Sequence, residues 1–221
     1  MKFQLISQGA QRNLMSQSTT TFATPASEAA LTALAEHLRE RNFEPLIVST
    51  AAEAKAAVMS RIPEGAEVHS GKSKTLEDIG VFGELMESDR YDFLRKRMFK
   101  MDRKTQMREI TKLGAAPDYM VGSVHAVTEA GQLVTASASG SQLGPYASGA
   151  GRLILVVGSQ KVVPDLDAAL QRITEYVQPY EDGRLREQMG VGTQLARILI
   201  LERDFNPGRT AVILVREPVG V

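Results

Sequence analysis

The chain has 221 residues, of which 43% are apolar and 24% are charged. This length and composition are typical of one large globular domain, and they exclude a disordered chain or a mini-protein that depends on disulfides. The 26 basic and 26 acidic side chains cancel, which excludes a strong overall field for nucleic acid or anionic membranes. The absence of cysteine excludes iron–sulfur clusters and thiol chemistry, and no cofactor is expected.

The N-terminal segment, residues 1–26, is rich in Ser, Thr and Gln, and we expect it to form a mobile arm. It lacks the continuous apolar core and the cleavage site of a secretory signal. The longest apolar runs, residues 153–157 and 211–215, are far shorter than the roughly 18 residues that a membrane-spanning helix needs. We therefore expect a cytoplasmic protein without a membrane partner, in which residues 27–221 form one domain.

Helices and strands alternate in the first part of this domain. Apolar residues at helical spacing predict a helix over 27–42, and a short apolar run predicts a strand over 46–48. A capping-box pattern that begins at Thr50 predicts a helix over 51–59. A strand over 66–69 is then followed by a polar loop and the start of another helix.

The middle of the chain changes in character. A charged stretch from Tyr91 to about Leu113 keeps apolar residues three or four positions apart, which predicts one amphipathic helix. Three strands are predicted after it, over 118–121, 124–129 and 132–136.

The last third begins with a Gly- and Ser-rich loop over 137–144. The elements predicted after it are a short helix near 145–150, a strand over 153–157, a helix capped by Asp165, a helix over 185–195, and strands over 198–201 and 210–215. Strands that alternate with helices predict an α/β fold, Rossmann-like, with a mostly parallel sheet and helices on both faces.

Two loops that each follow a strand and precede a helix are candidate anion sites. Backbone N–H groups, hydroxyls and lysines at such a position can address a phosphate or carboxylate, and strand ends are where open α/β sheets bind ligands. The alternative is a loop that only caps a helix. The first loop contains Ser70, Gly71, Lys72, Ser73, Lys74 and Thr75, and the second contains Ser139, Gly140, Ser141 and Gln142.

Two further polar clusters follow core elements, and either is a candidate lining for the same cleft. They are Gln160 with Lys161, and Glu181 with Arg184. No recognised metal-ligand spacing is present, so a metal site is not expected.

His125 and Glu129 share one face of a predicted strand, which makes them a candidate acid–base pair. The alternative is a hydrogen-bonded, half-buried histidine beside a turn glutamate, and the sequence favours that alternative.

The most asymmetric charge run lies within the predicted helix over 91–113. A solvated helix face explains such a run, and docking of an acidic partner, RNA or a coenzyme is the alternative. Its basic residues are Arg95, Lys96, Arg97, Lys100, Arg103, Lys104 and Arg108.

Ordered motifs along residues 28–221 resemble the LUD domain, the lactate-utilisation family of LutC- and YkgG-like proteins. They are the stretches 121–131, 140–143 and 157–163, together with 73–76, 179–182, 207–209 and 217–220. The resemblance implies a NagB/RpiA/CoA-transferase-like fold with the ligand cleft at strand ends. It also implies a link to bacterial oxidation of lactate to pyruvate, in which a partner subunit carries iron–sulfur clusters.

Three functions follow as hypotheses. The first is a cluster-free accessory component that binds a small anionic metabolite, such as a carboxylate, a phosphate or a coenzyme A-like group, in lactate or related 2-hydroxy acid oxidation. The second is acid–base or acyl-transfer catalysis on a phosphorylated sugar or coenzyme A thioester, with His125 or Glu129 reacting. The third is a regulatory or scaffold module that docks a partner through the basic helix; nucleic acid is not favoured.

Overall fold

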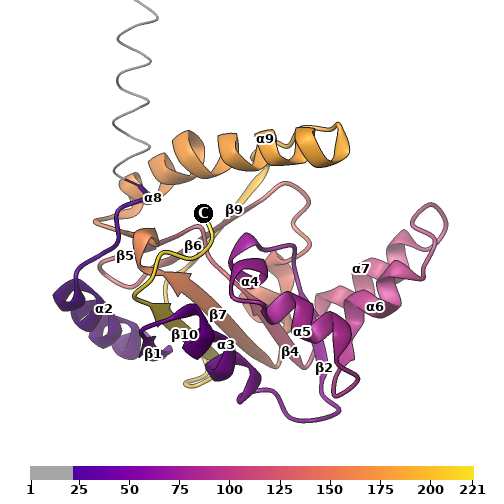
Figure 1. Ribbon diagram of the computed structural model, residues 1–221, viewed down its shortest axis with the longest axis horizontal. Coiled ribbons are helices and arrows are strands. Elements are labelled where there is room, and N and C mark those ends of the chain that lie inside the picture. The colour runs from indigo at the N-terminus through magenta and orange to yellow at the C-terminus, as the bar shows by residue number, and fades with distance from the viewer. Residues whose placement is uncertain (1–21) are drawn as a thin grey trace, which may run out of the picture.

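The computed structural model describes residues 22–221, and a six-stranded sheet forms its centre (Figure 1). All pairings in this sheet are parallel. Its strand order is β1 (Glu44–Val48), β10 (Thr210–Val215), β7 (Arg152–Gly158), β4 (Tyr119–Gly122), β2 (Glu67–Ser70) and β3 (Asp92–Phe93). The predicted α/β fold with a mostly parallel sheet is therefore confirmed.

The central strands are buried on both faces, which explains their unbroken apolar runs. In β7, Ile154 and Val156 face the core that contains α3 (Ala51–Met59), α4 (Lys74–Asp78) and α5 (Val81–Glu87). The alternate residues of β7 face the opposite core, which α2 (Glu28–Glu40) helps to form.

A second sheet covers part of that opposite face. The sequence prediction did not distinguish its strands from those of the first sheet. Its strand order is β8 (Val162–Val163), β5 (Ala126–Thr128), β6 (Leu133–Ser137) and β9 (Arg197–Leu201). It is mixed, because β6 pairs antiparallel with β5 and β9 while β8 pairs parallel with β5. This face of the parallel sheet is thus covered by α2 and by strands, and not by helices alone.

One continuous helical run packs beyond the second sheet. It begins with α8 (Leu166–Arg172), continues through a π-helical segment, η3 (Ile173–Val177), and ends with α9 (Gln178–Met189). Ala169 and Ile173 fill a small core against β5, β6 and β8. The helix predicted over 185–195 therefore starts earlier and ends at Met189, where Gly190 takes a left-handed φ of 69°.

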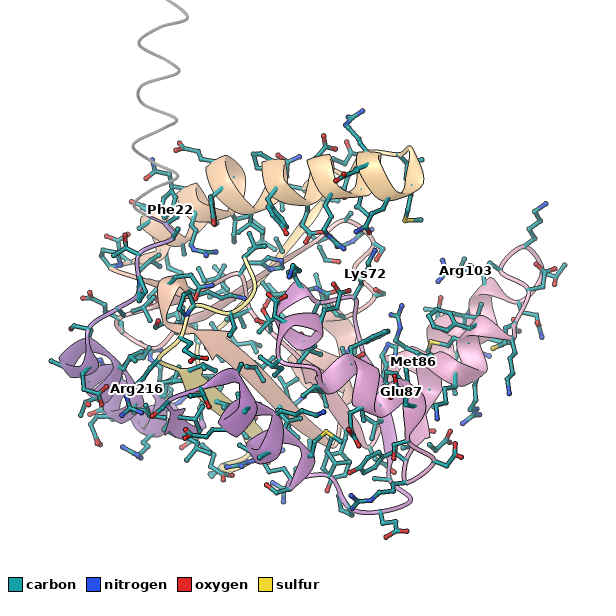
Figure 2. All side chains as sticks on the ribbon, in the orientation of Figure 1. Phe22, Lys72, Met86, Glu87, Arg103 and Arg216 are labelled. Carbon is teal, nitrogen blue, oxygen red and sulfur yellow. The ribbon has the colours of Figure 1, made fainter. Side chains whose placement is uncertain are left out.

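The single helix predicted from Tyr91 to Leu113 is wrong. The chain instead forms β3, α6 (Leu94–Phe99), an irregular turn and α7 (Met107–Ala115). Asp102 explains the break, because its carboxylate accepts hydrogen bonds from the backbone N–H of Lys104 (2.9 Å) and from Thr105 Oγ1 (2.8 Å), in competition with helical bonding. The α6–α7 pair projects from the body of the molecule, with Arg103 near its tip (Figures 1 and 2).

The predicted helix starts are confirmed by their hydrogen bonds. Ser27 Oγ accepts from the N–H of Ala30 at 3.2 Å, Thr50 Oγ1 accepts from the N–H of Glu53 at 3.2 Å, and Asp165 Oδ1 accepts from a backbone N–H of α8 at 2.8 Å. The short helix predicted near 145–150 is a π-helical turn, η1 (Pro145–Gly149).

The predicted mobile arm lies mostly outside the described residues, since the structure describes only its last five. Among these, Phe22 is buried beside Tyr176, and the N–H of Ala26 donates to the carbonyl of Ser159 at 3.2 Å. Over residues 22–221, no helix is long and apolar enough to cross a membrane.

Candidate functional site

The carboxyl ends of four parallel strands bring polar residues together at one edge of the sheet. Ser70 ends β2, Ser123 follows β4, a 3-10 turn, η2 (Ser159–Lys161), follows β7, and Arg216 follows β10. Ligands of open α/β sheets bind outside this edge, so it is the first place to look for a site.

Lys161 lies at the centre of this edge and is 2% exposed. Its Nζ donates to Thr75 Oγ1 at 2.8 Å, to Ser123 Oγ at 3.0 Å and to the carbonyl of Val124 at 3.2 Å. No carboxylate oxygen among residues 22–221 lies within 4.0 Å of this amine. We call Thr75, Ser123 and Lys161 the lysine cluster.

Burial lowers the pKa of Lys161 from its ordinary value to about 7. The nearby Arg172 guanidinium lowers this pKa further, and Asp78 acts in the opposite direction. Near neutral pH the amine is therefore present in both its charged and its neutral form, a state that suits either anion binding or proton transfer.

The C-terminal segment 216–221 lies beside α4 (Figure 1), and its Gly220 passes over the lysine cluster. Gln160 Nε2 donates to the carbonyl of Val219 at 3.0 Å, and the N–H of Gly220 donates to Asp78 Oδ2 at 3.1 Å. Gly220 has a φ of 76°, and a Cβ there would lie 2.1 Å from Thr75 Oγ1 and 3.1 Å from Lys161 Nζ. Glycine is required because the backbone passes directly over the cluster.

Ser123 is the partly exposed member of the lysine cluster, whereas Thr75 and Lys161 are each 2% exposed. Its backbone is held by Tyr146, whose hydroxyl accepts from the N–H of Ser123 at 3.0 Å and donates to its carbonyl at 3.1 Å. Burial raises the pKa of Tyr146, so this phenol stays neutral. The Ser123 main chain is thus fixed relative to Lys161.

The two loops predicted to share a site do meet, at one point. A Cβ on Gly71 would lie 3.2 Å from Gln142 Oε1. In the first loop Ser73 caps α4, Lys74 pairs with Asp78, and that hydrogen bond raises the pKa of Lys74. This loop therefore caps a helix, and its last residue, Thr75, belongs to the lysine cluster. Anion binding by the loop stays a prediction.

Helix α9 adds its own charges to this edge. Lys72 extends toward α9 (Figure 2), and its Nζ donates to Gln188 Oε1 at 3.1 Å. Arg184 pairs with Glu181 at 2.6 Å and also donates to Gln188 at 3.4 Å. Glu181 and Arg184, predicted to follow a helix, lie within α9, and Arg184 is joined through Gln188 to the first loop.

The rest of the second loop points elsewhere. Ser139 and Ser141 are exposed and bond to each other at 3.2 Å. A Cβ on Gly140 would lie 3.0 Å from Arg197 Cδ, and Arg197 donates to the carbonyl of Ala138 at 2.7 Å. The tip of this loop is therefore held against β9.

His125 and Glu129 are not brought together. His125 Nδ1 accepts from the N–H of Ala136 at 3.0 Å, and burial, with Lys161 and Arg172 nearby, lowers its pKa to about 3. Glu129 is exposed at the turn after β5, four residues away, which is about 13 Å along an extended strand. His125 is a neutral, hydrogen-bonded histidine in this structure, and a catalytic role for either residue stays a prediction.

The predicted basic run is divided by the break between α6 and α7. Arg95 turns inward, where Nη1 donates to the carbonyl of Ser70 at 3.2 Å and the guanidinium lies 5.6 Å from the Phe82 ring centroid. Arg97 bonds to Asp92 at 2.9 Å. The remaining charges stay on the projecting pair of helices.

Sequence reasoning missed three residues that shape the site: Ser123, Arg172 and Gly220. Ser123 carried a usable signal, since a small polar residue directly follows a buried strand. Arg172 is fully buried and donates to the carbonyl of His125 at 2.5 Å, but its position in an amphipathic helix gives no warning of this.

Metal ligands are not grouped here. Among residues 22–221, no three His, Asp or Glu side chains lie close enough together to hold a metal ion.

Comparison with known proteins adds a family match. The family model described as LUD domain matches residues 31–215. The crystal structure of a DUF162 family protein from Deinococcus radiodurans is similar at 13% identity and a TM-score of 0.48, over 86% of this chain and 99% of that one. No curated protein matches the chain.

Proposed function

Because the chain belongs to the LUD-domain family, we propose that it binds a small anionic metabolite at the carboxyl edge of its parallel sheet. Family membership supports a protein related to lactate utilisation. Within that setting, the chain acts as an accessory component of lactate or related 2-hydroxy acid oxidation, and its partner is a subunit that carries iron–sulfur clusters.

The observation that carries this proposal is the buried amine of Lys161, which donates to three neutral oxygens and has no carboxylate oxygen within 4.0 Å among residues 22–221. A buried charge without a counter-charge destabilises a fold. A site that keeps such a group gains that charge partner when an anionic ligand binds. Lactate, pyruvate and phosphate each carry the negative charge that Lys161 lacks as a close partner, and the segment 216–221 that covers Lys161 must move to admit them.

The charges around the lysine cluster support the same choice of ligand. Lys72 is exposed and bonds to a neutral amide, so its charge remains available to an anion. Lys74 and Arg184 are already neutralised by Asp78 and Glu181, and they serve mainly to hold α4 and α9 in place.

Thermal unfolding in the presence of single ligands tests the proposal. A ligand at about 100 times its dissociation constant adds about 2.7 kcal/mol to the free energy of unfolding. We expect a rise in melting temperature with lactate, pyruvate, phosphate or coenzyme A, and loss of that rise in Lys161→Met and Lys72→Met. Lys112→Met, an exposed lysine replaced in the same way on α7, is the matched control and keeps the rise.

Either of two results would contradict the proposed binding site. If none of these anions raises the melting temperature, or if Lys112→Met abolishes the rise as completely as Lys161→Met, the site is not at the lysine cluster.

A further inference from the structure

The lysine cluster has the geometry of an activated hydroxyl nucleophile. Ser123 Oγ lies 3.0 Å from Lys161 Nζ, within the range for direct proton transfer. Lys161 is in turn oriented by Thr75 Oγ1 at 2.8 Å. A nucleophile, a base and a group that orients the base are the three parts of a serine–lysine catalytic arrangement.

Exposure decides which of the three would react. Lys161 and Thr75 are 2% exposed, so a substrate carbonyl cannot reach either side chain without moving the segment 216–221. Ser123 is partly exposed, and its backbone is fixed by both hydrogen bonds to Tyr146. Ser123 is thus the one residue of the three that a substrate can approach directly. Its Oγ donates to the carbonyl of Val124 at 3.2 Å, so this hydrogen must turn toward Lys161 before it is transferred.

We propose that Ser123 is the nucleophile, and Lys161 its general base, in the hydrolysis of a small acyl ester or thioester bound at this edge. The inference rests on the proposed function, because the same site must first hold the anionic acyl compound. It replaces His125 and Glu129 with a different pair of reacting groups for the acyl-transfer hypothesis.

The steps balance without an oxidant or a metal. Ser123 Oγ attacks the acyl carbon as Lys161 Nζ accepts its proton, and the bond from carbon to the leaving oxygen or sulfur then breaks. The leaving atom departs with the bonding electron pair and takes the proton from Lys161. Water cleaves the acyl-serine in the same manner, giving a carboxylic acid and an alcohol or thiol overall.

The charges that face Lys161 favour its use as a base. Arg172 from α8 lowers the pKa of Lys161, Asp78 from α4 raises it, and the neutral His125 before β5 lies near enough for the charge of Lys161 to affect it. Since the amine has a pKa of about 7, a large share of it is neutral at physiological pH. The rate of a Ser123 reaction should therefore rise about tenfold per pH unit below 7 and level off above it.

Covalent labelling of the full chain tests the proposal. The probes are an alkyl fluorophosphonate and p-nitrophenyl acetate, and peptide mass spectrometry locates the label. We expect labelling at Ser123, about 100-fold slower in Lys161→Met, with a rate that follows the amine's titration in the unmutated chain. The exposed Ser60 at the end of α3 is the internal control and stays unlabelled.

Thr75 is a positioning residue in this account. Thr75→Ser should keep the labelling rate and its pH profile, whereas Thr75→Val should displace the profile along the pH axis because the lysine loses one oxygen partner. Circular dichroism confirms that each variant is folded.

The two proposals fail in different ways. If neither probe modifies Ser123 while lactate or phosphate still raises the melting temperature, the nucleophile is overturned and the binding function stands. If Ser123 is labelled with the expected pH profile but no anion shifts the melting temperature, the nucleophile is supported and the anionic metabolite is overturned. Equal labelling of Ser60 and Ser123 also overturns the nucleophile.

Discussion

Two cations lie at opposite edges of the parallel sheet, Lys161 buried and Arg209 largely buried, and they differ in their counter-charges. At the amino edge, Arg209 pairs with Asp204 at 3.1 Å, and its other donors bond to the carbonyls of Pro145, Tyr146 and Ala150. At the carboxyl edge, Lys161 has three oxygen partners and no anion within ion-pair distance in the described chain. Arg209 therefore has an anionic partner, whereas Lys161 has only neutral ones among the described residues.

The comparison shows why a cavity alone does not locate a site. A cavity of about 280 Å³ lies at the amino edge and is lined by Asp204, Phe205 and Arg209. Its buried charges already satisfy each other, so a ligand there would compete with existing bonds. The lysine cluster holds an amine with no carboxylate oxygen within 4.0 Å among residues 22–221, and it lies where strand ends of this fold class bind ligands.

The largest expected effect on stability comes from breaking the ion pair between Arg209 and Asp204. Asp204→Ala leaves Arg209 buried without its anion, and we expect the free energy of unfolding to fall by about 3–5 kcal/mol. Urea denaturation measures this loss. Ligand affinity at the carboxyl edge should be unchanged below the unfolding range, and a weakened affinity would mean that the two edges are coupled.

Replacing Lys161, the cation without an ion-pair partner, should change the free energy of unfolding in the opposite direction. Lys161→Met replaces a buried amine with an apolar side chain of similar length, and we expect stability at pH 6–7 to rise by about 2 kcal/mol while anion binding is lost. A loss of stability as large as that of Asp204→Ala would show that Lys161 is a structural residue.

The pH dependence of stability tests the Lys161→Met prediction further. The pKa of Lys161 is about 7 in the folded chain and 10.5 as its ordinary value, so the lysine lowers stability fully below pH 7. This effect disappears as pH rises from 7 to 10.5. The stability difference between Lys161→Met and the unmutated chain should therefore shrink over that range, and a constant difference would contradict the lowered pKa.

The smallest expected effect is at the glycine that covers the cluster. Gly220→Ala places a methyl group against Thr75 at a left-handed φ of 76°, and we expect a stability loss of about 1–2 kcal/mol. Gly65→Ala is the control for strain alone, because it has the same φ of 76° and no atom within 4 Å of the added Cβ. Only Gly220→Ala should also weaken anion binding.

The fold could be predicted from the sequence more completely than the candidate site. Caps such as Thr50 and Asp165 act within a few residues, and the apolar run of β7 is a local pattern, so both were predictable. Which strands join the second sheet, by contrast, depends on long-range pairings such as that of β6 with β9, and apolar alternation does not encode a partner.

Lys161 illustrates the same limit at the site. Its position after a core strand marked it as a candidate, but the sequence did not indicate that it would be buried. Part of its cover comes from Gly220, which lies about 60 residues further along the chain and passes over the cluster, where its carbonyl accepts from Gln160. His125 is the converse case, because a residue type suited to acid–base chemistry is kept neutral by burial and by the nearby Lys161 and Arg172, which lower its pKa.

The ionisation of Lys161 is the most direct test of the comparison between the two edges. A nuclear magnetic resonance titration that follows the lysine side-chain Cε signals, assigned with Lys161→Met, measures it in the intact chain. We predict a midpoint near pH 7 that moves upward when an anionic ligand is bound. A midpoint near 10.5, unmoved by any anion, would show that Lys161 is an ordinary lysine and would contradict the account.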